Sequence, residues 1–149
     1  MTHPLNDGVL KYFCPELEGS EAWLSPASSL GNSSHRFGSH PEIVEYLWDS
    51  LAPGLPVDCR ALVCGRPSLV APRRKVIFAV PLGTEYGLRL PPAEFTLARA
   101  AGAEVVHHYT TVSVTLNLAE RFGPNWVFGV FDSREPEWCV AALEFAEAA

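Results

Sequence analysis

Three short apolar runs lie close together in the middle of the chain, and each is bounded by glycine, proline or charge. They cover residues 58–65, 76–83 and 86–90. Runs of this length, rich in Val, Ile, Leu, Phe and Tyr, are typical of β-strands. The connections between them are short, which favours an antiparallel meander, with residues 66–75 as the connection between the first two runs. Val76 to Val80 is apolar throughout, which predicts a strand covered on both faces, and Pro81 predicts its end or a bulge.

Helical periodicity appears in three segments on either side of these runs. Ser39 and Glu42 fit a capping box that opens the first helix, whose apolar residues recur along one stripe. The Ala-Pro-Gly sequence at 52–54 predicts its end. A second helix is predicted from Pro91 to Gly102, because glycine suits the position just after a helix. A third is predicted to follow residues 132–136.

The segment between the second and third helices has strand character. Residues 104–109 and 125–131 are apolar enough for strands, and residues 112–118 alternate between apolar and polar side chains. The sequence 119–123 can also extend a helix back to Leu116, so both interpretations of this boundary stay open.

The first 38 residues show no clear period. Ser-rich sequence from Ser25 to Ser34 is typical of a loop, but the segment before it is too apolar for a disordered tail. We therefore expect an arm, residues 1–38, that packs on the rest of the chain with a short helical turn or strand near Val9 to Phe13. Covering an open sheet edge is one role for such an arm.

Together these patterns predict an α+β fold in a single domain. We expect an antiparallel sheet of about four to six strands with about three helices packed on it. The arm, residues 1–38, precedes the α+β domain, residues 39–149. The chain is long enough to bury roughly 70% of its unfolded surface, so it needs no covalent staple.

Composition points to a cytoplasmic protein. No apolar run approaches the roughly 20 residues that span a bilayer, and the N-terminal sequence lacks the basic and apolar regions of a secretory signal. We therefore expect no membrane association and reduced cysteines. The net charge of -6 argues against generic binding to nucleic acid.

The charge is unevenly distributed along the chain. Six of the eleven basic residues fall between positions 60 and 90 with one acid, so that segment carries +5 and the remainder -11. These residues are Arg60, Arg66, Arg73, Arg74, Lys75 and Arg89. One interpretation is a solvated sheet face whose arginines pair with acidic helices. The other is a basic surface that receives an acidic partner or a phosphate.

Cysteine and histidine offer few signs of chemistry. Cys59 and Cys64 on one strand would lie about 17 Å apart on opposite faces, so they cannot share a zinc ion. Cys14 and Cys139 have no thiol at a paired spacing, and we expect structural cysteines, no metal and no cofactor. A catalytic cysteine with a distant histidine stays an alternative. His107 and His108 would point to opposite faces of a strand, and either becomes a general base if it faces a pocket beside an acid such as Glu104 or Asp58.

The order of the predicted elements is similar to that of a known family of small domains. The segments that match are the helix 43–51, the sequence Cys64-Gly65-Arg66-Pro67, the strand 76–79, the sequence 86–91, the helix 93–102 and the closing segment 126–146. In this order, residues from about 41 to 148 resemble small α+β domains of the TfoX N-terminal and MmcQ/YjbR-like type. The resemblance implies a non-enzymatic module with a regulatory role, competence regulation included, and transfers no catalytic residue. Arg73 and Arg74 stand where the family has a small turn with glycine, and residues 1–38 and 103–125 are not covered.

Three functions follow as expectations. The first is a regulatory or protein-interaction module that binds a protein partner, or a second copy of itself, through the basic region from Arg60 to Arg89. The second is a small-molecule binder or small enzyme with a pocket near His107, His108 and Arg89. The third is a DNA-associated regulator, which would require strongly salt-dependent binding.

Overall fold

A computed structural model describes residues 2–17, 19–27, 40–105, 107–108, 115–116, 118–129 and 135–149. In this part of the chain, an antiparallel sheet has six strands in the order β1-β2-β3-β4-β5-β8. The strands are β1 (Leu24–Pro26), β2 (Arg60–Val63), β3 (Arg66–Val70), β4 (Ile77–Leu82), β5 (Glu85–Arg89) and β8 (Trp126–Gly129). A separate pair joins β6 (His107–His108) and β7 (Thr115–Leu116). The predicted α+β fold with an antiparallel sheet is confirmed.

The described residues contain five α-helices, more than the three that the periodicity predicts. They are α1 (Asp7–Phe13), α2 (Pro41–Glu45), α3 (Pro92–Ala100), α4 (Leu118–Phe122) and α5 (Glu135–Glu147). A π-helical segment, Tyr46–Leu51, continues α2, and short 3-10 turns lie at Pro4–Asn6, Pro15–Leu17, Glu21–Trp23 and Ala52–Gly54. The N-cap of α2 is His40, whose Nδ1 accepts a hydrogen bond from the Glu42 N–H at 3.2 Å. The predicted cap, Ser39, lies outside the described residues.

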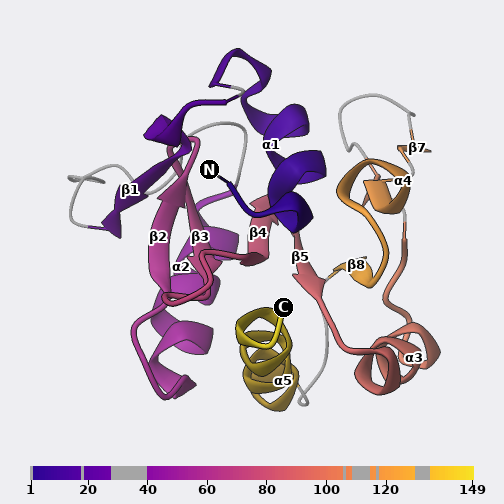
Figure 1. The fold of residues 1–149 in the computed structure, drawn as a ribbon. Helices are drawn as coiled ribbons and strands as arrows, with labels where there is room; N and C mark the ends of the chain where they lie inside the picture. The colour runs from indigo at the N-terminus through magenta and orange to yellow at the C-terminus, as the bar shows by residue number, and fades with distance from the viewer. Residues whose placement is uncertain are drawn as a thin grey trace.

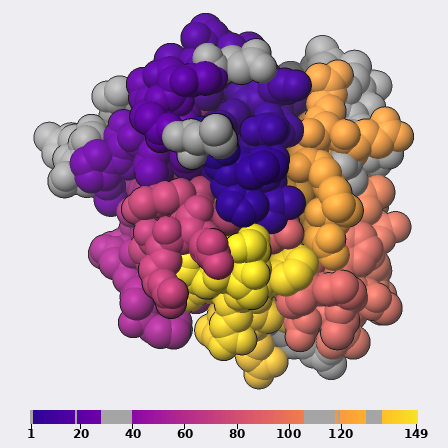
Figure 2. Space-filling model, viewed as in Figure 1, coloured from indigo at the N-terminus to yellow at the C-terminus, as the bar shows by residue number. Residues whose placement is uncertain are grey.

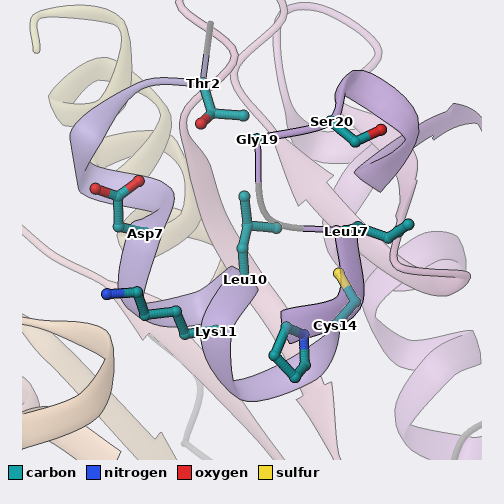
Figure 3. A pocket seen from close by; sticks show the side chains of 9 residues that line it. Thr2, Asp7, Leu10, Lys11, Cys14, Leu17, Gly19 and Ser20 are labelled. Atoms are coloured by element: carbon teal, nitrogen blue, oxygen red, sulfur yellow. The ribbon is translucent and has the colours of Figure 1, made fainter.

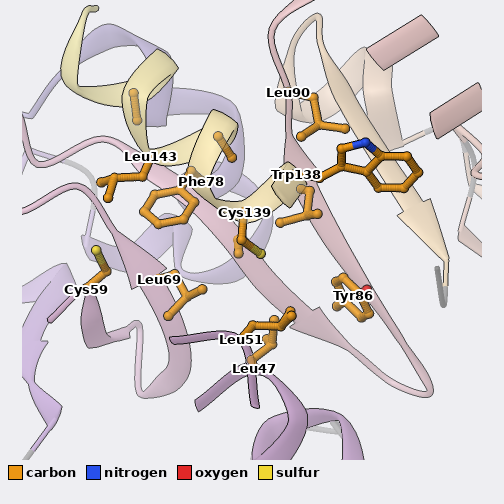
Figure 4. Close-up of a cluster of buried hydrophobic side chains, with 14 of the residues drawn as sticks. Leu47, Leu51, Cys59, Leu69, Phe78, Tyr86, Leu90, Trp138, Cys139 and Leu143 are labelled. Carbon is orange, nitrogen blue, oxygen red and sulfur yellow. The ribbon is translucent and has the colours of Figure 1, made fainter. Parts of the chain in front are cut away.

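Helices cover both faces of the sheet (Figure 1). We call the face under α2, α3 and α5 the body face. Its buried cluster includes Leu47 and Leu51 from the π-helical segment, Phe78 from β4 and Cys139 from α5 (Figure 4). We call the other face, under α1 and α4, the arm face, and its separate cluster includes Val9 and Trp23. Such burial on two sides explains why the central strands are apolar at nearly every position.

Strand β4 lies between β3 and β5 and is buried along its whole length. This confirms the prediction of a strand covered on both faces. Pro81 lies one residue before the end of β4, opposite Tyr86. Proline lacks the N–H that a ladder needs, so a position near the strand end suits it.

The segment 66–70 is a strand rather than part of a connection. β3 pairs with β2 in a register that runs from Val63 opposite Arg66 to Arg60 opposite Leu69, and it pairs with β4 on its other side. Pro67 and Ser68 interrupt the apolar pattern, and a proline within a run argues against a strand. Ser68 is nevertheless fully buried, and its carbonyl accepts a hydrogen bond of 3.0 Å from Trp48 Nε1. Tertiary packing therefore overrides the local pattern.

The N-terminal arm packs on the sheet in two ways. Helix α1 lies across the arm face, at the position where a short helical turn or strand was expected, and β1 adds a strand beside β2. Figure 2 shows α1 in indigo against α4 in orange. Their approach is close, because a Cβ on Gly8 would lie 1.9 Å from the Arg121 carbonyl oxygen. The predicted boundary of the arm at residue 38 lies outside the described residues.

A buried asparagine fixes the start of the arm. The Asn6 side chain donates to the Lys75 carbonyl at 2.7 Å and accepts from the Ile77 N–H at 2.9 Å. It therefore satisfies two backbone groups at the entry to β4 that would otherwise be buried without partners. Asn6 itself is fully buried.

The segment after α3 is only partly described. Glu104 forms an isolated bridge with Phe128, β6 and β7 pair, and α4 begins at Leu118. Both alternatives for this region are thus present in part, with strand at Thr115–Leu116 and helix from Leu118. Most of the predicted strand 112–118 lies outside the described residues.

Candidate functional site

The six predicted basic residues do not form one surface. Arg66 lies over the Phe13 ring of the arm, with its Cζ 4.3 Å from the ring centroid. Arg89 is buried, with its Cζ 4.3 Å from the centroid of Phe145 in α5. The other four lie near one end of the sheet: Arg60 begins β2, and Arg73, Arg74 and Lys75 occupy the β3–β4 turn.

Two adjoining hollows lie at this end of the sheet. The first, of about 370 Å³, is lined by Leu24, Ser25, Pro26, Asp58, Cys59, Arg60, Ala61, Val70, Pro72 and Lys75. The second, of about 240 Å³, is lined by Ala52, Pro53, Leu55, Pro56, Val57, Asp58 and Arg60. Because they share Asp58 and Arg60, we treat them as one groove and call it the edge groove. β1 of the arm forms one wall, and the β3–β4 turn carries Lys75 on another.

A hydrogen-bonded ion pair stands where the two hollows meet. Arg60 donates from Nε to Asp58 Oδ1 at 3.0 Å and from Nη2 to Asp58 Oδ2 at 3.2 Å. These hydrogen bonds hold the pKa of the Asp58 carboxyl below its usual value. The side chains are 40% and 62% exposed, so the pair contributes at most about 1 kcal/mol to stability. Both charges stay accessible to a ligand.

Lys75 carries a positive charge on a fixed turn. Its φ is 57°, its N–H donates to the Ala71 carbonyl at 2.8 Å, and its own carbonyl accepts from Asn6. The side chain is exposed, and the described residues provide it with no ion pair. The backbone is thus fixed while the ammonium group stays in solvent.

One acidic residue, Glu147, approaches the same turn from α5. The Arg74 N–H donates to Glu147 Oε1 at 2.9 Å, and Figure 2 shows the end of α5 in yellow against this part of the chain. Arg73 and Arg74 are exposed. Asp58 and Glu147 therefore offset part of the positive charge at this end of the sheet.

The Cys59 thiol lines the groove but is not activated. It is 2% exposed and donates to the Val57 carbonyl at 3.4 Å. Burial, reinforced by the negative charges of Asp58 and Glu147, raises the pKa of the Cys59 thiol to about 11. The thiolate is the nucleophilic form, so this cysteine is a poor nucleophile at neutral pH.

Cys14 and Cys64 form a disulfide, with their Cα atoms 6.0 Å apart. The prediction that all four cysteines are reduced is therefore wrong, and Cys14 meets a partner that no paired spacing in the sequence indicates. The arm folds back across the sheet and brings Cys14 to the β2–β3 turn, which is 50 residues away in the sequence. Cys59 and Cys139 are buried and take no part in this disulfide. A small cavity of about 120 Å³ lies beside Cys14 and is lined by the arm alone (Figure 3).

Among the residues with described side chains, no group of three or more His, Cys, Asp and Glu could hold a metal ion. His107 and His108 lie in β6, but their side chains are outside the described residues. Arg89 is 7% exposed, and its Nη1 has no hydrogen-bond partner among the described residues. Burial lowers the pKa of its guanidinium. Arg89 is not part of the edge groove.

In the described part of the chain, both outer edges of the sheet offer few backbone N–H groups to an added strand. The Cys64 N–H donates to the Trp23 carbonyl at 2.8 Å, so Leu24 and Pro26 of β1 direct their backbone groups outward. The Leu24 N–H already donates to Glu21, and proline has no N–H. At the other edge, β8 exchanges two hydrogen bonds with Glu104 through Phe128. A partner would therefore find few backbone donors with which to extend the sheet.

Comparisons with protein-family models, with curated proteins and with solved structures found no match for this chain. The resemblance to TfoX N-terminal and MmcQ/YjbR-like domains stays a prediction. In the described residues, no helix combines the length and apolarity needed to cross a bilayer.

Proposed function

We propose that this chain is a non-enzymatic, regulatory protein-interaction module, and that its edge groove holds an acidic and partly apolar segment of a partner protein. The observation that carries the proposal is the position of Lys75. Its exposed ammonium group stands on a fixed turn at the wall of an open hollow, beside Arg73 and Arg74. A carboxylate in the groove would give it an opposite charge at short range.

The other end of the edge groove suits apolar side chains. Its lining includes Pro53, Leu55, Pro56 and Val57, and Val57 is 47% exposed. Exposed apolar area beside charged groups is typical of surfaces that bind other proteins. A segment that combines apolar and acidic residues would fit both ends.

The chemistry of the groove supports binding rather than catalysis. Cys59 lines the groove, and the raised pKa of its thiol opposes reactivity as a nucleophile. Asp58 and Glu147 would repel the continuous negative charge of a nucleic acid more than a few carboxylates of a peptide. These points favour a protein partner over the ligand-binding and DNA-associated alternatives.

We also propose a cytoplasmic location. Disulfides in that compartment are usually transient and serve redox sensing or catalysis. In the cytoplasm, the Cys14–Cys64 disulfide would therefore have a regulatory role.

A fluorescence anisotropy titration tests the proposal. The probe is a short fluorescein-labelled peptide of alternating Glu and Leu, and a single-stranded oligonucleotide of the same net charge is titrated in parallel. We expect salt-dependent binding of the peptide and weaker binding of the oligonucleotide. Substituting Arg73→Ser together with Lys75→Asn should weaken peptide binding about tenfold. Asn is chosen because it tolerates the positive φ of position 75.

The matched control removes two exposed positive charges elsewhere, with Arg99→Gln in α3 and Arg121→Gln in α4. Arg99→Gln also removes a hydrogen bond from Arg99 Nη1 to the Ala103 carbonyl, which lies outside the edge groove. Peptide affinity should change less than about twofold in this control, because the two charges act on the groove only at long, screened range. Equal losses in the two double variants, or no peptide binding by the parent protein, would refute the proposed site. Tighter binding of the oligonucleotide would instead support the DNA-associated alternative.

A further inference from the structure

We propose that the Cys14–Cys64 disulfide is a thiol-exchange site, and that its reduction by a cellular dithiol weakens binding in the edge groove. The inference rests on the proposed function, because it concerns control of the same groove. Its basis is a physical connection: the disulfide ties down the segment of the arm that continues into one groove wall.

The connection runs through Cys64. This residue is bonded to Cys14, and its N–H donates to the Trp23 carbonyl at 2.8 Å. Trp23 directly precedes β1, whose three residues Leu24, Ser25 and Pro26 line the groove. A strand of three residues that ends in proline forms few ladder hydrogen bonds of its own. Its position therefore depends on the covalent link next to it.

The start of the arm is held independently. Asn6 hydrogen-bonds to Lys75 and Ile77, and Val9 is fully buried in the core of the arm face. Reduction would not release this part. The expected change is local loosening of β1 and the segment around Cys14, while the Lys75 side of the groove keeps its geometry.

The two sulfur atoms differ in access. Cys64 lies in the β2–β3 turn and is partly exposed, whereas Cys14 is 3% exposed. An external thiolate would attack the Cys64 sulfur, form a mixed disulfide and expel Cys14 as a thiolate, which then takes up a proton. The second thiol of the dithiol then attacks the first sulfur of the same dithiol, which is bonded to Cys64 in the mixed disulfide, and releases Cys64 as a thiol. In sum, the protein gains two thiols, and the dithiol is oxidised to its disulfide.

The surroundings favour this exchange. Arg66 lies over the ring of Phe13, the residue before Cys14, and follows Cys64 by two residues, so a permanent positive charge is carried next to both cysteines in the chain. The cavity beside Cys14 leaves space for its side chain to turn away once the bond is broken (Figure 3). Cys59 and Cys139 are buried on the other face of the sheet and do not compete.

The experiment compares the oxidised protein with the same protein reduced by dithiothreitol under native conditions. Mass spectrometry after alkylation counts the thiols, and anisotropy measures affinity for the Glu-Leu peptide. We expect the two buried thiols to stay protected, two new thiols to appear, and peptide affinity to fall about tenfold, a typical allosteric coupling. Reoxidation should restore the affinity. The Cys14→Ser, Cys64→Ser double variant, checked for folding by circular dichroism, should bind like the reduced protein.

Several results would overturn the inference. A disulfide that resists the dithiol in the folded protein would be a structural link only, and equal peptide affinity in both states would show that it does not control the groove. If the oxidised protein fails to bind the peptide, the proposed function fails. Hydrogen exchange then still tests whether the disulfide holds β1 in position. Reduction should then speed exchange of the Ser25 and Leu62 amides but not of the Ile77 amide. Unchanged exchange at Ser25 and Leu62 would contradict it.

Discussion

The two faces of the sheet are covered by different means. The body face is packed by α2, α3 and α5 through one large apolar cluster. On the arm face, by contrast, the arm is also held by a buried asparagine and a disulfide, which both connect residues far apart in the sequence. Apolar packing resists a change in redox state, whereas a disulfide responds to it directly. Both faces thus contribute stability, and the arm face also carries the covalent link on which the proposed redox control of the edge groove depends.

The largest effect should come from the body face and should not depend on redox state. Phe78→Ala removes a fully buried ring from β4 and should lower the free energy of unfolding by about 4 kcal/mol. Urea unfolding of the oxidised and the reduced protein measures this. The loss should be equal in the two states within about 0.5 kcal/mol. A clearly smaller loss in the reduced protein would show that the two faces are not independent.

Removal of the disulfide should have an effect of similar size. The Cys14→Ser, Cys64→Ser variant loses a bond that closes a loop over a separation of 50 residues, for which chain entropy predicts about 4 kcal/mol. Urea unfolding should show this loss, and hydrogen exchange should place the fastest new exchange in β1 and the adjoining part of the arm. Uniform acceleration across β4 and β5 would contradict the assignment of the disulfide to local control.

Asn6 gives a smaller effect on the same face. Asn6→Ala leaves the Ile77 N–H and the Lys75 carbonyl buried without partners and should cost about 2 kcal/mol. Asn6→Asp keeps the acceptor for the Ile77 N–H but loses the donor to the Lys75 carbonyl. At neutral pH its loss of unfolding free energy should therefore come mainly from repulsion between the new carboxylate and the Lys75 carbonyl oxygen. Urea unfolding compares the two. No loss in Asn6→Ala would mean that water replaces the side chain.

The smallest effect is a pH dependence from Cys59. Its pKa is raised to about 11 in the folded protein, so the neutral thiol is favoured by folding. The resulting stability is complete below the unfolded pKa near 9 and is lost as pH rises through the folded value, by about 1–2 kcal/mol. Urea unfolding between these pH values should show the loss in the parent and less of it in Cys59→Ala. If the unfolding free energy falls equally with pH in the parent and in Cys59→Ala, the loss comes from other groups.

Local patterns were sufficient to predict the parts of the fold that sequence neighbours determine. The continuous apolar run at Val76 to Val80 correctly indicated a strand buried on both faces, and Gly102 correctly followed the end of α3. Strand β3 was missed because Pro67 and Ser68 look unsuitable in isolation. Its burial depends on Trp48 and the strands on either side, which lie elsewhere in the sequence.

The candidate site was less predictable because it depends on where strands end and how the arm returns. Arg60 and Lys75 were predicted as members of one basic region and do line the same groove, but Arg66 and Arg89 lie elsewhere. The disulfide had no local signal, since spacing in the sequence does not show which cysteines meet in space. The signal that could have suggested it was the apolar arm, whose packing brings Cys14 across the sheet.

The decisive test of ligand binding in the edge groove is a titration of the oxidised, ¹⁵N-labelled protein with the Glu-Leu peptide, followed by amide chemical shifts. We expect shift changes to cluster around the edge groove, at the amides of Ser25, Arg60 and Lys75, and to shrink in the reduced protein. Shifts centred on Arg89 or α3, or no saturable shifts at all, would contradict it.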